Sequence, residues 1–178
     1  MSGDPLLAHI RNVPDYPKKG ILFRDITPLL GHAASLREAC RRMASPFEAH
    51  PPDLVAGIEA RGFILGGMIA HFLNTGFIPV RKPGKLPARS VQREYALEYG
   101  SGKLELHQDC VQKGQRVLLV DDLVATGGSA EAAVWLLRSL GAVVEAGSFL
   151  IDLPALGGKK KLEDLGLKFH ALLSFPGQ

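Results

Sequence analysis

Two adjacent carboxylates, Asp121 and Asp122, stand where an apolar stretch of the chain gives way to a loop of small and hydroxylated residues. The residues just before the pair, VLLV at 117–120, have the composition of a strand buried on both faces of a parallel sheet. The loop at 125–129 has the sequence ATGGS, and a segment with helical periodicity follows it. Backbone N–H groups and hydroxyls at a helix N-terminus bind phosphate, so this stretch predicts a phosphate site.

The acidic pair requires a partner of its own, because two carboxylates beside a bare phosphate would repel it. Either Mg²⁺ bridges the pair to the ligand, or the pair accepts hydrogen bonds from two ribose hydroxyls. A ligand with a 5′-phosphate and a nearby diol satisfies the loop and the pair together, so the residues indicate a ribose 5-phosphate group. Other classes fit less well. A receiver domain needs more chain after the pair, a Walker A loop needs a Lys, and an incidental pair of acids would cost stability.

The composition is that of an ordinary globular protein, with 46% hydrophobic and 22% charged residues among 178, and we expect a single domain over residues 1–178. No apolar run approaches the ~20 residues of a membrane span, and the N-terminal residues do not resemble a signal peptide. Cys40 and Cys110 lack metal-binding spacing and fit reduced thiols. We therefore expect a cytoplasmic protein that has no membrane partner.

The formal net charge is +3, and the basic residues are concentrated between Arg81 and Arg93. A nucleic-acid surface would carry a longer Lys/Arg tract with interleaved aromatic residues, so we expect no nucleic-acid partner. A short basic cluster instead fits a compact polyanion such as pyrophosphate.

The stretch VLLVDDLVATGGS at 117–129 resembles the phosphoribosyl-pyrophosphate (PRPP) motif of type I phosphoribosyltransferases, in the form found in their adenine-specific members. The resemblance implies an α/β fold with a mostly parallel twisted sheet flanked by helices, a small N-terminal hood formed mainly by about residues 1–32, and a flexible catalytic lid loop. It implies that Asp121 and Asp122 bind the ribose and hold Mg²⁺ indirectly, through PRPP and water. It also implies a 5′-phosphate site made by Ala125, Thr126, Gly127, Gly128 and Ser129.

Two further strings resemble the family's pyrophosphate-binding segments. The string GIEARGF at 57–63 is similar to its pyrophosphate loop, which implies roles for Glu59, Ala60 and Arg61 and a non-proline cis peptide bond in the turn. The string RKPGKLP at 81–87 implies that Arg81, Lys82 and Lys85 neutralise the leaving pyrophosphate. From the residues alone, the guanidinium of Arg61 suits a phosphate, and a surface ion pair between Glu59 and Arg61 is the alternative. For the basic residues at 81–85 the alternative is a run of solvated charges.

The base site and the lid are implied by two more strings. GILFRDITP at 20–28 resembles the adenine-binding hood, where Phe23 stacks on the purine and backbone groups of Leu22 and Arg24 read its edge. On physical grounds alone, a buried edge segment is the better interpretation. YALEYG at 95–100 resembles the catalytic lid, which implies that Glu98 is the general acid near purine N7 and that Tyr99 belongs to the lid. Alternation alone would make Glu98 a solvent-facing strand residue.

The resemblance implies a homodimeric purine salvage enzyme that converts adenine and PRPP to AMP and pyrophosphate with Mg²⁺. The 6-oxopurine members of the family carry an acid where this chain has Ala125, which leaves the N7 proton to Glu98. Two alternatives stay open. One is a phosphoribosyltransferase for another base, such as xanthine, hypoxanthine or orotate, and the other is a regulator that senses PRPP without catalysis.

Apolar periodicity and turn residues predict the remaining elements. We expect a mobile loop at 88–100 that returns as a strand, and Trp135 in a packing role. The predicted helices cover 5–12, 33–49, a segment from 63 and a segment after 129. The predicted strands cover 54–58, a short segment from 77, 103–108, 117–122, 142–151 and 168–175.

Overall fold

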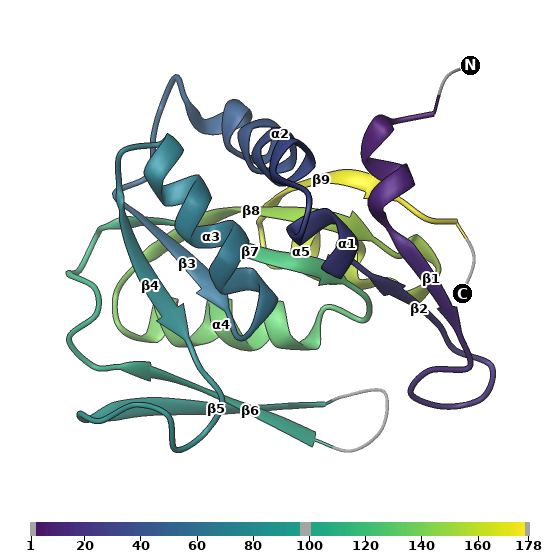
Figure 1. Ribbon diagram of the computed structural model, residues 1–178. Helices are drawn as coiled ribbons and strands as arrows, with labels where there is room; N and C mark the ends of the chain where they lie inside the picture. The colour runs from purple at the N-terminus through teal and green to yellow at the C-terminus, as the bar shows by residue number, and fades with distance from the viewer. Residues whose placement is uncertain (1–2, 97–100, 177–178) are drawn as a thin grey trace.

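A five-stranded parallel sheet forms the centre of the structure, a computed structural model that describes residues 3–96 and 101–176 (Figure 1). The strand order is β4-β3-β7-β8-β9, and every neighbouring pair is parallel. The strands are β3 (Leu54–Ile58), β4 (Gly76–Val80), β7 (Arg116–Val124), β8 (Val143–Asp152) and β9 (Lys168–Ser174). The middle strand, β7, is buried almost throughout its length, as its apolar sequence predicts. The expected α/β sheet is confirmed.

Helices cover both faces of the sheet. Helices α2 (Ala33–Ala44) and α3 (Arg61–Phe72) pack on one face, where Cys40, Leu65 and Val120 belong to one core cluster. Helices α4 (Gly128–Ser139) and α5 (Gly158–Asp164) pack on the other face through a second cluster. Short 3₁₀ turns, η2 (Ser45–Phe47) and η3 (Pro154–Leu156), follow α2 and β8. The predicted helix at 33–49 is therefore shorter than expected, because Pro46 cannot supply a helical N–H.

The N-terminal segment forms a separate small layer beside the carboxyl ends of the strands (Figure 1). It contains η1 (Pro5–His9), the antiparallel strands β1 (Arg11–Pro14) and β2 (Leu22–Asp25), and α1 (Thr27–Leu30). The predicted helix at 5–12 is wrong in its second half, because Ile10 is extended and Arg11 already pairs with Asp25. Asp25 accepts hydrogen bonds from the N–H and hydroxyl of Thr27, which begins α1.

A two-stranded hairpin, β5 (Ser90–Ala96) and β6 (Ser101–His107), packs against α4. The segment predicted as a mobile loop is thus a regular strand over Ser90–Ala96, paired with β6 through residues such as Gln92 and Glu105, and residues 97–100 lie outside the described residues. An antiparallel bridge between Arg81 and Glu105 joins the hairpin to the segment that follows β4. The hairpin is therefore tied to the segment that the sequence associates with pyrophosphate.

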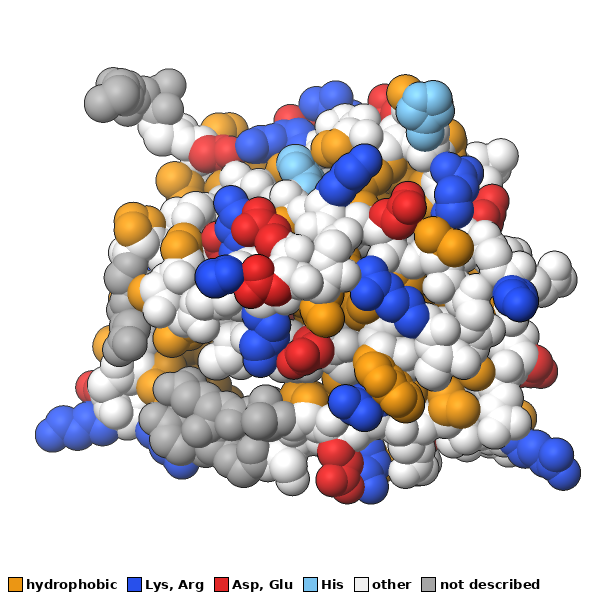
Figure 2. All heavy atoms as spheres, turned by 180° about the vertical axis from the view of Figure 1, so that it is seen from behind, with side chains coloured by type: hydrophobic (Ala, Val, Ile, Leu, Met, Phe, Trp, Pro, Cys, Tyr) orange, Lys and Arg blue, Asp and Glu red, His pale blue; other side chains and the backbone are white. Residues whose placement is uncertain are grey.

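The remaining element boundaries agree closely with the sequence pattern. Strand β3 has the predicted bounds, whereas α3 begins at Arg61, before the predicted Phe63. Trp135 lies on α4 with 44% of its surface exposed, and the Arg93 guanidinium stacks over its ring at 4.3 Å. Acidic and basic side chains are interspersed on the face shown in Figure 2. Within residues 3–96 and 101–176, no helix is long and apolar enough to cross a membrane.

Candidate active site

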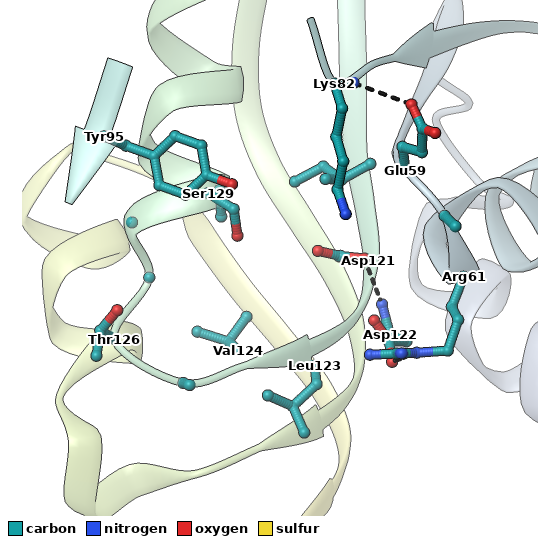
Figure 3. A pocket seen from close by; sticks show the side chains of 16 residues that line it. Glu59, Arg61, Lys82, Tyr95, Asp121, Asp122, Leu123, Val124, Thr126 and Ser129 are labelled. Atoms are coloured by element: carbon teal, nitrogen blue, oxygen red, sulfur yellow. Dashed lines mark hydrogen bonds and ion pairs between the residues drawn. The ribbon is translucent and has the colours of Figure 1, made fainter. Parts of the chain in front are cut away.

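The carboxyl ends of β3 and β7 open into a cavity of about 440 Å³ (Figure 3). This is the edge of an open parallel sheet at which ligands bind. Most of the residues predicted to bind PRPP line it together: Glu59, Ala60, Arg61, Lys82, Asp121, Asp122, Ala125, Thr126, Gly127, Gly128 and Ser129.

The phosphate loop takes its shape from two glycines. Gly127 has φ +77°, a left-handed conformation that glycine adopts without strain, and α4 begins at the next residue. A Cβ on Gly127 would also lie 3.1 Å from the Cα of Gly158, and the Gly158 N–H donates to the Ala125 carbonyl at 3.0 Å. The segment before α5 thus supports the loop from behind. The loop leaves the N-terminus of α4 and the hydroxyls of Thr126 and Ser129 facing the cavity.

The acidic pair is buried at the base of the cavity. Asp121 is 8% exposed and Asp122 is 5% exposed. Burial raises the pKa of Asp121 well above its usual value, and the neighbouring charge of Asp122 adds to the effect. A Cβ on Gly62 would come within 2.8 Å of the Asp121 Oδ1, so a glycine at the start of α3 allows this approach. Two buried acids this close require a cationic or hydroxyl-bearing partner.

Arg61 supplies one cation to this pair. Its Nε lies 2.5 Å from the Asp122 Oδ2. Burial opposes the charge of Arg61, but the charge and hydrogen bond of Asp122 outweigh burial and raise the pKa of the guanidinium. The alternative ion pair between Arg61 and Glu59 is therefore not the arrangement that the structure shows.

Glu59 organises the basic segment instead. The Glu59–Ala60 peptide bond is cis, as the resemblance implies. The Glu59 Oε2 accepts from the Arg81 Nε at 3.2 Å and from the Lys82 N–H at 2.9 Å. Burial raises the pKa of Glu59, but these two donors outweigh it and the net shift is downward. The Lys82 side chain extends toward Asp121 in the cavity (Figure 3).

Arg81 and Lys85 do not line this cavity. The Arg81 guanidinium is bonded to Glu59 and donates to the Lys85 carbonyl at 3.1 Å. Their direct contact with pyrophosphate stays a prediction, and the structure gives Arg81 a role in shaping the turn.

A second cavity, of about 340 Å³, lies under the N-terminal layer. Phe23 lines it and makes an edge-to-face contact with Tyr16 at 5.2 Å. Arg61 lines both cavities, so the two meet at its side chain. Strand β2 pairs with β1 along one edge, which leaves its other edge without a strand partner in this small sheet. The remaining lining residues are Val13, Asp25 and Thr27.

Leu22 and Arg24, predicted to read the base through their backbones, do not line the second cavity. The Arg24 guanidinium turns away, stacks over Phe175 at 4.4 Å and donates to the Asn12 side chain. Its backbone role stays a prediction. Glu98 and Tyr99 lie outside the described residues.

Two site residues were missed by sequence reasoning. Tyr95 lines the first cavity, and its ring lies over Gly102, where a Cβ would collide with it. Glu105 is a buried carboxylate beneath the basic segment. A glycine opposite an aromatic residue in a hairpin was the available signal for Tyr95, but only a known strand register reveals it.

The donor set fits a Mg²⁺ ion that is bound mainly through a ligand. Asp121 and Asp122 line the cavity and offer hard carboxylate oxygen atoms, the ligands that Mg²⁺ prefers. Residues 3–96 and 101–176 contain no group of three or more His, Cys, Asp or Glu side chains arranged to hold a metal by themselves.

Comparisons with known proteins agree with this geometry. Residues 29–161 match the phosphoribosyl transferase domain model. The adenine phosphoribosyltransferase of Mesorhizobium japonicum is 57% identical over 174 residues, which is 98% of this chain and 96% of the relative. The solved structure of adenine phosphoribosyltransferase from Rhodothermus marinus has a TM-score of 0.89 and 48% identity, and covers 96% of each chain.

A more distant solved structure shares the same fold. The adenine enzyme of Giardia lamblia, solved in complex with 9-deazaadenine, has a TM-score of 0.92 and 32% identity, with 99% of each chain covered. From these matches and the geometry of the two cavities, the chain belongs to the phosphoribosyltransferases, in the adenine phosphoribosyltransferase family.

Proposed function

We propose that the protein transfers the 5-phosphoribosyl group of PRPP to adenine and releases AMP and pyrophosphate, a step of purine salvage. One observation carries the proposal: a phosphate loop and a buried acidic pair line one cavity, and Arg61 joins it to a second cavity lined by the aromatic rings of Tyr16 and Phe23. Relatives that are more than half identical over nearly the whole chain carry the name of this activity.

PRPP binding begins at its 5′-phosphate. The N–H groups and hydroxyls of residues 125–129 bind this group, and Asp121 and Asp122 accept hydrogen bonds from the ribose hydroxyls. These contacts are remote from the reacting carbon, so their binding energy serves to orient C1′ toward the base.

The reaction breaks the bond from C1′ to the pyrophosphate oxygen and forms a bond from C1′ to adenine N9. Positive charge develops on the ribose ring as pyrophosphate leaves, and the negative field of the acidic pair stabilises it. Arg61 and Lys82 line the cavity on the side of β3 and the basic segment, where they stabilise the departing negative charge. Asp121 and Asp122 would hold Mg²⁺ together with PRPP, and the ion would supply further charge neutralisation of the pyrophosphate.

The base requires a proton exchange as well. Adenine gives up one proton overall as the C1′–N9 bond forms, and Glu98 is proposed to accept it from N7 and to return it to N7 in the reverse direction. Ala125 has no ionisable group, so the phosphate loop offers no alternative acid at that position. Phe23 stacks on the purine, and the unpaired edge of β2 offers backbone groups of Leu22 and Arg24 to its polar edge.

A cytoplasmic homodimer completes the proposal. Cys40 and Cys110 are free, and burial raises their thiol pKa values to about 12 and about 11, which suits unreactive reduced thiols. Helix α3 exposes Ile64 and Phe72, two large apolar side chains that a second copy would cover.

A base-panel assay tests the activity. The protein is incubated with Mg²⁺, PRPP and, separately, adenine, hypoxanthine, guanine, xanthine or orotate, and nucleotide formation is followed by absorbance. We expect AMP from adenine alone. Turnover of a 6-oxopurine would refute the assignment of adenine as the base. PRPP binding without turnover of any base would favour the alternative of a regulator that senses PRPP without catalysis.

A further inference from the structure

Glu105 is a buried carboxylate that the proposed chemistry does not use. It lies on β6 between Leu104 and Leu106, and only 3% of its surface is exposed. A carboxylate in such a position costs free energy unless hydrogen bonds compensate for its lost hydration. Its partners therefore indicate what the residue does.

The partners of Glu105 come from two segments that are distant in sequence. Its Oε1 accepts from the Gln92 Nε2 at 2.5 Å, across the β5–β6 hairpin. Its Oε2 accepts from the Gly84 N–H at 3.2 Å. Its backbone exchanges two hydrogen bonds with Arg81, at 3.0 and 2.7 Å. In the described part of the chain it forms no ion pair, so neutral donors hold this charge.

These contacts clamp the basic segment between two glutamates. Glu59 holds the Arg81 guanidinium and the Lys82 N–H from the β3 side. Glu105 holds the Arg81 backbone and the Gly84 N–H from the hairpin side. Gly84 has φ +75°, so the turn presents its N–H through a backbone conformation that favours glycine. Between the two clamps, Lys82 extends into the first cavity (Figure 3).

We infer that Glu105 is a positioning residue for pyrophosphate, which fixes the turn at residues 81–85 so that Lys82 meets the leaving group. The inference rests on the proposed function, because it assigns pyrophosphate to this side of the cavity. Glu105 acts through Gly84 and Arg81 and does not touch the ligand. Its carboxylate accepts from two N–H donors on opposite sides, the Gly84 backbone and the Gln92 amide.

The test substitution is Glu105→Gln, which replaces one acceptor oxygen by an NH₂ donor. Because the Gln92 amide can rotate to accept from that donor, both contacts can persist, but the Gly84 N–H then donates to a neutral oxygen and both hydrogen bonds lose the charge of the carboxylate. AMP pyrophosphorolysis is measured with Mg²⁺, and KM is determined separately for pyrophosphate and for AMP. We expect the KM for pyrophosphate to rise about tenfold with a much smaller change in the KM for AMP.

The direction of the effect separates positioning from simple electrostatics. Removing a negative charge near a pyrophosphate site would by itself tighten binding. The matched control is Glu94→Gln, which removes the same charge from an exposed residue of the same hairpin that pairs with Lys103. We expect both KM values of this control to stay within about twofold of the original protein.

A double variant tests the contact itself. In Gln92→Glu combined with Glu105→Gln, the amide at position 105 donates to the carboxylate at position 92 while its oxygen accepts from Gly84. The pair of side chains again carries one carboxylate, so we expect part of the lost pyrophosphate affinity to return. If Glu105→Gln alone fails to fold by circular dichroism, Gln92→Ala, which removes one partner, is measured instead and should raise the KM for pyrophosphate selectively.

The outcomes distinguish the inference from the proposed function. If the protein without substitutions showed neither adenine transfer nor AMP pyrophosphorolysis, the proposed function would be refuted. An active original protein with an unchanged KM for pyrophosphate in the folded Glu105→Gln variant would refute only the role of Glu105. Equal rises in both KM values, or no recovery in the folded double variant, would also overturn it.

Discussion

Arg61 and Asp122 form an ion pair, with 2.5 Å between Nε and Oδ2, at the point where the two cavities meet. Arg61 comes from the start of α3 and Asp122 from β7, so the pair joins two elements of the site. The Arg61 guanidinium also lies 5.7 Å from the centre of the Phe23 ring. One side chain thus contacts the acidic pair and the hood.

Replacing Arg61 with Lys should weaken PRPP binding. Lysine keeps the charge but cannot present the planar fork of donors that pairs with a carboxylate and a phosphate together. We expect the KM for PRPP to rise by roughly 10- to 100-fold, the range for hydrogen bonds to charged groups. Steady-state kinetics measure it, with Arg116→Lys as the control because Arg116 pairs with Asp53 at the opposite ends of the strands. Equal effects of the two substitutions would contradict the role of Arg61.

Glu98→Gln should slow turnover and spare PRPP binding. Glutamine cannot exchange the N7 proton, and general acid–base catalysis typically contributes ~10²–10⁴-fold. We expect a loss of this size in kcat with little change in the dissociation constant of PRPP, measured by calorimetry. Turnover near that of the original protein would remove Glu98 from the mechanism.

Gly127→Ala should damage both stability and phosphate binding. Alanine at φ +77° is strained by about 1–2 kcal/mol, and its Cβ would press on Gly158. Gly114→Ala is the matched control, because Gly114 has φ +86° with open space around its Cβ position. Thermal unfolding should show losses in both variants, whereas only Gly127→Ala should weaken AMP binding. Normal AMP affinity in Gly127→Ala would show that the loop does not bind the 5′-phosphate.

Asp121→Asn should stabilise the free protein in a pH-dependent way. Burial raises the folded pKa of Asp121 above its ordinary value of 3.8, so the folded state holds the extra proton between these two values. The free energy of unfolding therefore falls as pH rises through that window, and asparagine removes this loss. Urea unfolding at several pH values should show an advantage for Asp121→Asn that grows with pH from about 4 upward. An advantage that is independent of pH would contradict the assignment.

Asp25→Asn should lower the free energy of unfolding in the same urea experiment, the opposite of the effect expected for Asp121→Asn. The hydroxyl of Thr27 donates to Asp25 and, with the Thr27 N–H and Arg11, lowers its pKa to about 2. Asp25 therefore contributes stability above its unfolded pKa, and this contribution is lost as pH falls through the folded pKa. We expect Asp25→Asn to be less stable than the original protein at neutral pH.

The phosphate loop could be predicted from the sequence because all of its signals are local. Strand β7, the pair Asp121 and Asp122, and the loop at 125–129 are consecutive, so composition and turn residues define them without knowledge of the rest of the chain. Strand β3 was predicted with its observed bounds for the same reason.

Contacts between distant segments could not be derived in this way. The helix expected at 5–12 fails where Arg11–Pro14 pairs with β2, a tertiary contact that overrides local propensity. Glu105 is buried because β6 has β5, with Gln92, on one side and the segment of Arg81 on the other. No local sequence pattern encodes both neighbours. The partner of Arg61 also could not be predicted locally, because Asp122 meets Arg61 only after α3 packs beside β7.

AMP should occupy both cavities at once, with its phosphate in the first and its base in the second, and a crystal structure of the protein with AMP tests this arrangement. We predict phosphate oxygens at about 3 Å from the N–H groups of residues 126–129. The ribose hydroxyls should lie on Asp121 and Asp122, and the purine should stack on Phe23. An AMP phosphate bound away from this loop, or a purine that does not reach the cavity under β2, would show that the two cavities do not form one nucleotide site.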